Sequence, residues 1–356
     1  MTPSRYDRQI ILKEFGVSAQ ERLAKAKVLV VGAGGLGVPV LQYLNAMGVG
    51  HLAFMDADVV QESNLHRQVI YTEKQIGMPK VNAATAFLAA QNSHTKLEPL
   101  NFFLDSKNAL ATIARFDVVV DASDNFPTRY LVNDACVILK KPFIYGALHG
   151  FEGQLSVFNY NSGPTYRCLF PKVPKANEIP NCDTQGVLGI LPGIVGNLQA
   201  LECVKVLTGI GAVLAGKLLI FDALKQAYHT FEIPKQEKAL HLDNLQSSYA
   251  LDCRLTDATI STAQFKQLSE LPTAIQIIDV RNPEEVAAQA YEGAVNIPLS
   301  VLENEIKKHP LQAEVYFLCQ SGFRSAKAVE LLQEQFPNKR MISVAGGINA
   351  LFAHEY

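Results

Sequence analysis

Short, unbroken apolar runs alternate with longer stretches of helical pattern along the first part of the chain. The clearest run is Val28–Val31, and the helical pattern Val38–Met47 follows it. Runs without polar alternation are typical of strands that are buried on both faces of a parallel sheet. Two more such runs end at Asp56 and Asp121. The pattern predicts an α/β fold, a doubly wound Rossmann-like sheet with helices on both faces.

A second series of apolar runs begins after a polar stretch. Residues 236–256 have no clear apolar period, which is typical of an interdomain linker. Strand-like runs then return at Ala274–Arg281 and Val315–Leu318, with helical patterns between and after them. We therefore predict a larger domain over residues 1–235, a linker over 236–256 and a smaller α/β domain over 257–356.

The composition is that of a globular protein with sizeable cores. Of the 356 residues, 48% are hydrophobic and 19% are charged, and the formal charge of −2 gives no electrostatic reason to expect nucleic acid or an anionic membrane as a partner. The most apolar region, Gly186–Leu207, carries Pro192 and Glu202, which favours a buried loop and helix over a membrane span. The N-terminus lacks the apolar core of a signal peptide, and the six cysteines form no CxxC pair. We therefore expect a cytoplasmic protein with reduced thiols.

A glycine-rich turn separates the first predicted strand from the first buried helix. Four glycines follow the apolar run: Gly32, Gly34, Gly35 and Gly37. They let a phosphate approach the backbone at the N-terminus of the helix. Asp56 lies about 20 residues further on, where an acidic residue meets a ribose hydroxyl in nucleotide-binding domains. The arrangement predicts a nucleotide site, usually for NAD or FAD, and the alternative is a tight strand–helix turn without a ligand.

Charged side chains in the same part of the chain favour a nucleoside triphosphate over a dinucleotide. A triphosphate carries more negative charge, needs basic side chains and usually brings Mg²⁺ held by a carboxylate. Arg8, Arg67 and Lys80 are candidates for the cations, and Asp124, or alternatively Asp121, is the candidate ligand for Mg²⁺. Each has a plainer interpretation as a solvated charge or, for Asp124, as the N-cap of the next helix. Spacing alone therefore leaves the nucleotide open.

Six motifs follow one another in order over residues 1–234. They are RYDRQ, GAGGLG, the acid Asp56, SNLHRQ, MPK and DASDN. In this order they resemble the MoeB/ThiF/HesA family of adenylyltransferases, the bacterial relatives of ubiquitin-activating enzymes. The resemblance implies an enzyme that uses ATP and Mg²⁺ to adenylate the C-terminal Gly-Gly carboxylate of a ubiquitin-like sulfur carrier. Cations that neutralise the charge developing at the α-phosphorus would be its main catalytic device.

The same resemblance assigns roles to individual residues. It places Gly35 against the phosphates, Asp56 at the ribose and Asp124 on the magnesium ion. Arg8 matches an arginine that family members insert into the site of the neighbouring subunit, which implies a homodimer and a catalytic role for Arg8. The remaining nucleotide-binding candidates in these motifs are Ser63, Asn64, Arg67, Lys80 and Asn125.

Cys182 is a candidate nucleophile in the stretch NCDTQGVLG. A cysteine beside a flexible, glycine-containing loop can attack an acyl adenylate or a persulfide. In the family that the sequence resembles, a crossover loop that ends in a similar GVLG can carry such a cysteine. The alternative is a loop cysteine with no chemical role.

Many members of that family bind a structural zinc ion through two CxxC pairs, and this sequence lacks both. The first pair would fall at Thr165–Cys168, with threonine where a thiolate should be, and the second is missing from the stretch after Phe231. Two such pairs are a strong zinc signal, so we predict that this chain binds no zinc. What ties the loop of Cys168 to the sheet instead is open at this stage.

Cys319 is the candidate for sulfur chemistry in the second predicted domain. It ends a strand-like run and begins the loop CQSGFRS before a helix, so backbone N–H groups, the helix dipole and Arg324 would surround a thiolate or persulfide. The alternative is an inert cysteine at a strand end. With IIDVR and VAGGI, the loop resembles a rhodanese-type sulfurtransferase domain over residues 256–356, in which Cys319 would carry the persulfide and Arg324 would face the anion. The sequence departs from that pattern at Ala290–Tyr291 and Leu351, away from the loop.

Together the two resemblances imply one reaction sequence, in which adenylation activates the carrier and the Cys319 persulfide converts its terminus into a thiocarboxylate. Cys182 would attack the adenylate first, or would release the product by forming a disulfide with Cys319. A cysteine desulfurase or thiosulfate would supply the sulfur. The domain fusion resembles the molybdopterin-synthase sulfurylase arrangement of molybdenum cofactor biosynthesis, which favours a MoaD-like carrier over the ThiS-like carrier of thiamine biosynthesis.

Two other classes of function remain alternatives. An NAD-dependent oxidoreductase with a sulfurtransferase tail would need a hydride-transfer site, for which His149 is the acid–base candidate near the predicted crevice. A non-catalytic dimer that presents carrier proteins to other enzymes would have no need of Arg8, Lys80 and Asp124.

Overall fold

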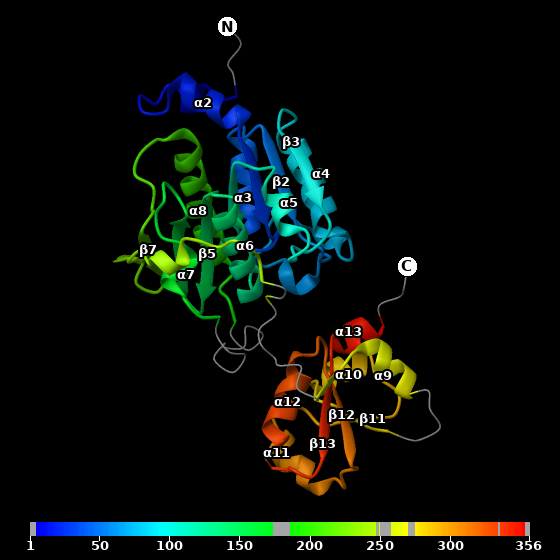
Figure 1. Ribbon diagram of the computed structural model, residues 1–356. Coiled ribbons are helices and arrows are strands. Elements are labelled where there is room, and N and C mark those ends of the chain that lie inside the picture. The colour runs from blue at the N-terminus through cyan, green and yellow to red at the C-terminus, as the bar shows by residue number, and fades with distance from the viewer. Residues whose placement is uncertain are drawn as a thin grey trace. The chain divides into compact units, whose positions relative to one another are not determined.

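The computed structural model describes residues 5–173, 186–246, 249, 258–269, 275–333 and 335–352, so Cys182 lies outside the described residues. The chain divides into two units, Met1–Leu251 (unit 1) and Asp252–Tyr356 (unit 2), and Figure 1 colours them from blue to yellow-green and from yellow to red. Each unit has its own sheet. Among the described residues, every cluster of buried hydrophobic side chains lies within one unit.

The described part of unit 1 contains an eight-stranded sheet with the order β3-β2-β1-β4-β5-β6-β7-β8. Strands β3 to β5 are parallel, as the apolar runs predict, and β6 to β8 continue the sheet in antiparallel pairs. The strands are β1 (Lys27–Val31), β2 (His51–Met55), β3 (Lys96–Leu100), β4 (Val118–Asp121), β5 (Phe143–His149), β6 (Glu152–Phe158), β7 (Lys217–Asp222) and β8 (Ala227–Glu232).

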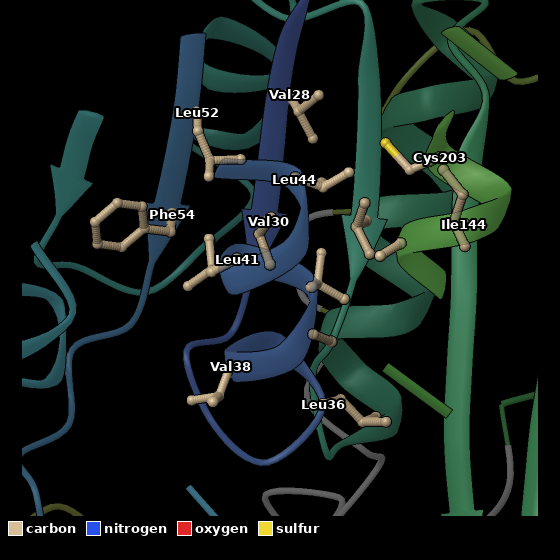
Figure 2. Close-up of a cluster of buried hydrophobic side chains, with 14 of the residues drawn as sticks. Val28, Val30, Leu36, Val38, Leu41, Leu44, Leu52, Phe54, Ile144 and Cys203 are labelled. Atoms are coloured by element: carbon tan, nitrogen blue, oxygen red, sulfur yellow. The ribbon is translucent and has the colours of Figure 1, made fainter. Parts of the chain in front are cut away.

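Strand β1 is buried on both sides because helices cover both faces of this sheet. Val28 and Val30 pack with side chains of α2, α3, α4 and α8, and Figure 2 shows them beside Leu41 and Leu44 of α3. The alternate residues of β1 pack with α5, α6 and α7 on the other face. Each such side chain contributes roughly 1.5–3 kcal/mol by leaving water. The helices are α1 (Asp7–Ile10), α2 (Gly16–Lys25), α3 (Gly37–Ala46), α4 (Lys80–Gln91), α5 (Ala109–Ile113), α6 (Phe126–Ile138), α7 (Tyr166–Leu169) and α8 (Ile190–Thr208).

Helix α8 is long and apolar enough to cross a membrane by length and composition, with a mean hydropathy of 1.4. Half of it is buried inside unit 1, where it packs against α3, β5 and β6. Its buried Gln199 donates to the backbone oxygen of Asp121 at 2.7 Å, and its buried Glu202 pairs with Lys205. These contacts are those of a core helix, as the sequence predicts.

Hydrogen bonds to the sulfur of Cys168 tie its loop to the segment that follows β8. The backbone N–H groups of Thr165 and Gln236 both donate to Sγ at 3.4 Å, and the Gln236 side chain donates to the Cys168 carbonyl at 2.9 Å. The Thr165 hydroxyl donates to the carbonyl of Ala239 at 3.1 Å. Part of the stretch that the sequence assigns to the linker therefore packs on unit 1, with a short 3₁₀ helix at Glu237–Ala239.

The described part of unit 2 is a five-stranded parallel sheet with the order β11-β10-β12-β13-β9. The strands are β9 (Thr259–Ile260), β10 (Gln276–Asp279), β11 (Ala294–Asn296), β12 (Glu314–Leu318) and β13 (Arg340–Val344). The helices are α9 (Thr262–Ser269), α10 (Pro283–Ala288), α11 (Leu302–Glu305), α12 (Phe323–Gln333) and α13 (Gly347–Leu351). One buried cluster lies on each face of the sheet, which confirms the prediction of a second α/β fold.

Candidate active site

A cavity of about 590 Å³ lies at the carboxyl ends of the parallel strands of unit 1. Segments that follow β1, β2 and β4 contribute Gly35, Asp56 and Asp124 to its lining, as expected for ligand sites in open parallel sheets. The other predicted residues that line it are Asn64, Arg67, Lys80 and Asn125. Ser63 and Arg8 are exposed and are not among the lining residues.

The glycine turn is closed too tightly for a side chain at Gly32 or at Gly37. Gly32 has φ +101°, and a Cβ there would lie 2.6 Å from the carbonyl oxygen of Ala122. A Cβ at Gly37, the first residue of α3, would lie 2.0 Å from the carbonyl oxygen of Gly32. The turn therefore presses against the end of β4, and the cavity lies at the N-terminus of α3, where backbone N–H groups and the helix dipole favour an anion.

Asp56 is buried beside this turn and accepts two backbone hydrogen bonds. The N–H of Ala33 donates to its carboxylate at 2.9 Å, and so does the N–H of Asp58, also at 2.9 Å. Burial raises the pKa of Asp56, while Lys80 and the two N–H groups oppose that rise. Lys80, only 5% exposed, lies with Nζ at 3.8 Å from Asp56 and 3.0 Å from Asp58. The carboxylates thus hold the ammonium group at the cavity wall.

Arg67 brings a second cation to the same wall. Its guanidinium donates to the backbone oxygen of Ser63 at 3.0 Å, so Ser63 anchors Arg67 through its main chain. Its stem lies against the glycine turn, because a Cβ at Gly35 would be 3.5 Å from Arg67 Cδ. Asn64 ends the 3₁₀ helix Glu62–Asn64 in the same segment.

Asp124 is exposed at the cavity, and it is not the N-cap of α6. Asn125 takes that role, since its side-chain oxygen accepts the N–H of Thr128 at 2.9 Å. The alternative interpretation of Asp124 as the cap of this helix is therefore wrong, and the cap lies one residue further on, at Asn125. The one hydrogen bond to the Asp124 carboxylate from a described residue comes from the Asn125 amide at 3.3 Å, so Asp124 can accept a divalent cation.

The loop of Cys319 in unit 2 is built around the sulfur atom. Cys319 is fully buried directly after β12, and its Sγ accepts the N–H of Gly322 at 3.1 Å. The Sγ also lies 3.5 Å from the hydroxyl of Ser325, which itself donates to the carbonyl of Gly322 at 3.0 Å. The loop then continues into α12, as the sequence predicts.

Two arginines hold this loop through carboxylates that sequence reasoning missed. Arg324 forms a two-pronged pair with Glu285 at 2.7 and 2.5 Å, which lowers the pKa of Glu285. Arg281 is fully buried, pairs with Asp279 at 2.7 Å and donates to the Gln320 side chain of the loop at 3.2 Å. Asp279 lies in the IIDVR motif and Glu285 follows it closely, so this motif was the sequence feature that could have predicted both partners.

A comparison with protein-family models identifies the family of the larger unit. The model of the ThiF family matches residues 6–242, which include the whole sheet of unit 1 and every residue of the cavity wall. The chain belongs to the ThiF family. A rhodanese-like domain matches residues 261–354, so the resemblances drawn from both halves of the sequence are confirmed.

Relatives of this ThiF-family chain align with it through both matched domains. The proteins named adenylyltransferase and sulfurtransferase MOCS3 from Drosophila ananassae and Xenopus laevis are each 38% identical to it. The alignments cover 98% and 97% of this chain and 82% and 85% of those proteins. Among solved structures, Escherichia coli MccB with ATP has a TM-score of 0.59 at 20% identity over 66% of this chain and 72% of that one, which shows the ThiF fold.

Proposed function

We propose that unit 1 adenylates the C-terminal carboxylate of a ubiquitin-like sulfur carrier with ATP and Mg²⁺, and that unit 2 supplies sulfur for a C-terminal thiocarboxylate. The observation that carries the proposal is the convergence of the glycine turn, two cations and an exposed carboxylate on one cavity. The names of the relatives support the same pair of activities. A MoaD-like carrier is the favoured partner.

The residues of the cavity suit attack of a carboxylate on an α-phosphate. Both reactants are anionic, so catalysis depends on cations that neutralise the charge of the transition state. Lys80 and Arg67 supply two such charges, and the N-terminus of α3 supplies backbone donors. Asp124 would hold Mg²⁺, which would screen the phosphate oxygens. Asp56 would accept a ribose hydroxyl.

Transfer of sulfur would start from a persulfide on Cys319. The terminal sulfur attacks the acyl carbon, AMP leaves, and an acyl disulfide joins the carrier to Cys319. A second thiol then attacks the Cys319 sulfur, so the thiocarboxylate leaves and a disulfide forms between the two cysteines, which an external thiol reduces. Cys182 is the candidate for that second thiol. A cysteine desulfurase or thiosulfate would renew the persulfide.

ATP–pyrophosphate exchange with purified MoaD-like and ThiS-like carriers tests the adenylation. We expect exchange that depends on one carrier, is lost in Asp124→Ala, and is unchanged in Asp243→Ala, a control at an exposed aspartate outside the cavity lining. No exchange with either carrier, together with tight binding of NAD, would favour the oxidoreductase alternative, since His149 does line the cavity. Carrier binding without exchange would favour the non-catalytic alternative.

We also propose a homodimer in which Arg8 acts in the partner's site. Arg8 lies on α1, outside the lining of its own cavity, and exposed apolar side chains follow it at Ile11 and Leu12 (71% and 56% exposed). Mixing the inactive variants Arg8→Ala and Asp124→Ala tests this. Mixed dimers contain one complete site, so exchange should return to about a quarter of the wild-type rate. No recovery in mixed dimers confirmed by mass would place Arg8 outside the site.

A further inference from the structure

A second group of cavity residues plays no part in the proposed contacts to ATP. It comes from the start of α6 and from the β5–β6 hairpin, and its polar members are Thr128, Arg129, Tyr145, His149 and Gln154. Arg129 and Gln154 stand out because each holds donors for which the described residues provide no acceptor.

Arg129 is a buried cation held in place by rings. It is 8% exposed, and its guanidinium carbon lies 5.5 Å from the ring centres of both Phe126 and Tyr145. Its hydrogen bond within the described chain is from Nη2 to the carbonyl of Ser123 at 3.2 Å, and Nε has no partner there. Nε is enclosed and does not face the cavity, whereas Nη1 makes no hydrogen bond with a described residue and is the donor that Arg129 offers to the cavity that it lines. A donor held in a largely buried wall favours a ligand with an acceptor.

The buried carboxylate of Asp121 does not form an ion pair with Arg129 among the described residues. Asp121 is fully buried and accepts from the N–H and hydroxyl of Ser123, but its Oδ2 has no partner among the described residues. No ion pair within 4.0 Å joins it to Arg129 in the described part of the chain. Burial raises the pKa of Asp121, and the charge of Arg129 only partly opposes that rise. The charge of Asp121 therefore does not supply an acceptor for the guanidinium nitrogens of Arg129 that make no hydrogen bond.

Gln154 is oriented by its neighbour. The hydroxyl of Tyr145 donates to the side-chain oxygen of Gln154 at 2.9 Å, and burial keeps Tyr145 protonated by raising its pKa to about 12. This bond fixes the amide plane, and Nε2 forms no hydrogen bond with a described residue. This part of the cavity wall thus offers two sets of donors.

We propose that Arg129 and Gln154 bind the two peptide carbonyl oxygens that precede the terminal residue of the carrier, and so position its terminal carboxylate for attack. The inference rests on the proposed adenylation. A Gly-Gly tail has no side chains, so it is held through its carbonyl oxygens, and fixed donors in a buried wall suit these. Arg129 and Gln154 would therefore act as positioning residues for the carrier and not for ATP.

The test is carrier-dependent ATP–pyrophosphate exchange by the full chain, with the KM measured separately for the carrier and for ATP. We expect Arg129→Lys to raise the carrier KM by about tenfold or more, as for loss of a charged hydrogen bond, and to leave the ATP KM within about twofold. Gln154→Leu should raise the carrier KM by a smaller factor of about three to ten. Arg115→Lys, an exposed arginine outside the cavity lining, is the matched control.

The outcomes distinguish the assignment of Arg129 and Gln154 to the carrier from the proposed adenylation itself. An unchanged carrier KM in both variants would overturn the assignment, and so would an equal rise in the KM for ATP, because that would place Arg129 on the nucleotide. If Arg129→Lys fails to fold, shown by loss of its thermal transition, the half-buried Gln154→Leu decides alone. Absence of exchange by the wild-type protein with every carrier would overturn the proposed function together with this inference.

Discussion

Replacing Gly37 by alanine is a direct test of how tightly the nucleotide turn is closed. The added Cβ would lie 2.0 Å from the Gly32 carbonyl oxygen, and real Cβ contacts essentially never fall under 3.0 Å. The turn must therefore open by about 1 Å, and it meets the end of β4 when it does, since Gly32 already has no space beside Ala122. We expect a loss of about 2–3 kcal/mol in the stability of unit 1, the upper part of the range of about 1–3 kcal/mol for overpacked sites.

Gly193→Ala provides the matched control for Gly37→Ala. Gly193 lies in α8, and its Cβ would meet no atom within 4 Å. Alanine is the better helix former, so this variant should gain about 0.5–1 kcal/mol. Calorimetry of the full chain measures the unit 1 transition, whose midpoint Gly37→Ala should lower by about 4–12 °C. A titration with ATP should show weaker binding in Gly37→Ala alone. Equal melting temperatures and equal ATP affinities for the two variants would refute the close contact at the turn.

Three further changes test the other contacts. Glu285→Gln removes the charge that pairs with Arg324 and should cost unit 2 about 1 kcal/mol at neutral pH. Because the pair lowers the pKa of Glu285, its contribution is complete above the ordinary value of 4.5 and is lost as the pH falls through the lower folded-state value, which unfolding at several pH values measures. Cys319→Ser should abolish thiocarboxylate formation, followed by the mass of the carrier, and leave pyrophosphate exchange intact; loss of both would contradict separate chemistries. Asn125→Ala should cost about 1 kcal/mol by removing the cap at the Thr128 N–H, while Asn125→Ser should restore most of it.

The parallel part of the fold was predictable because buried strands leave unbroken apolar runs. Val28–Val31 shows this most clearly, since each of its residues is buried on one face or the other. The antiparallel part was not predictable in the same way. Strand β8 (Ala227–Glu232) is almost wholly exposed, and its place is set by pairing with β7. Pairing of that kind depends on a partner strand and leaves little pattern in the sequence.

The residues of the candidate site were easier to predict than the side chains that form ion pairs with them. The motifs pointed to Lys80 and Arg324, but the carboxylates that hold them, Asp58 and Glu285, lie 22 and 39 residues away along the chain. Such distances carry no periodic signal. Polarity likewise could not separate a linker from a segment that packs, as the hydrogen bonds between Gln236 and Cys168 show.

The separation of the buried clusters has an evolutionary consequence. No described core residue of one unit belongs to a cluster of the other, so a packing change in one unit leaves the other core intact. Natural variation can therefore alter unit 2, which carries Cys319, without repacking the core around the cavity of unit 1. For the same reason we expect the chain to tolerate division at the junction of the units, so that lineages can recombine them as modules.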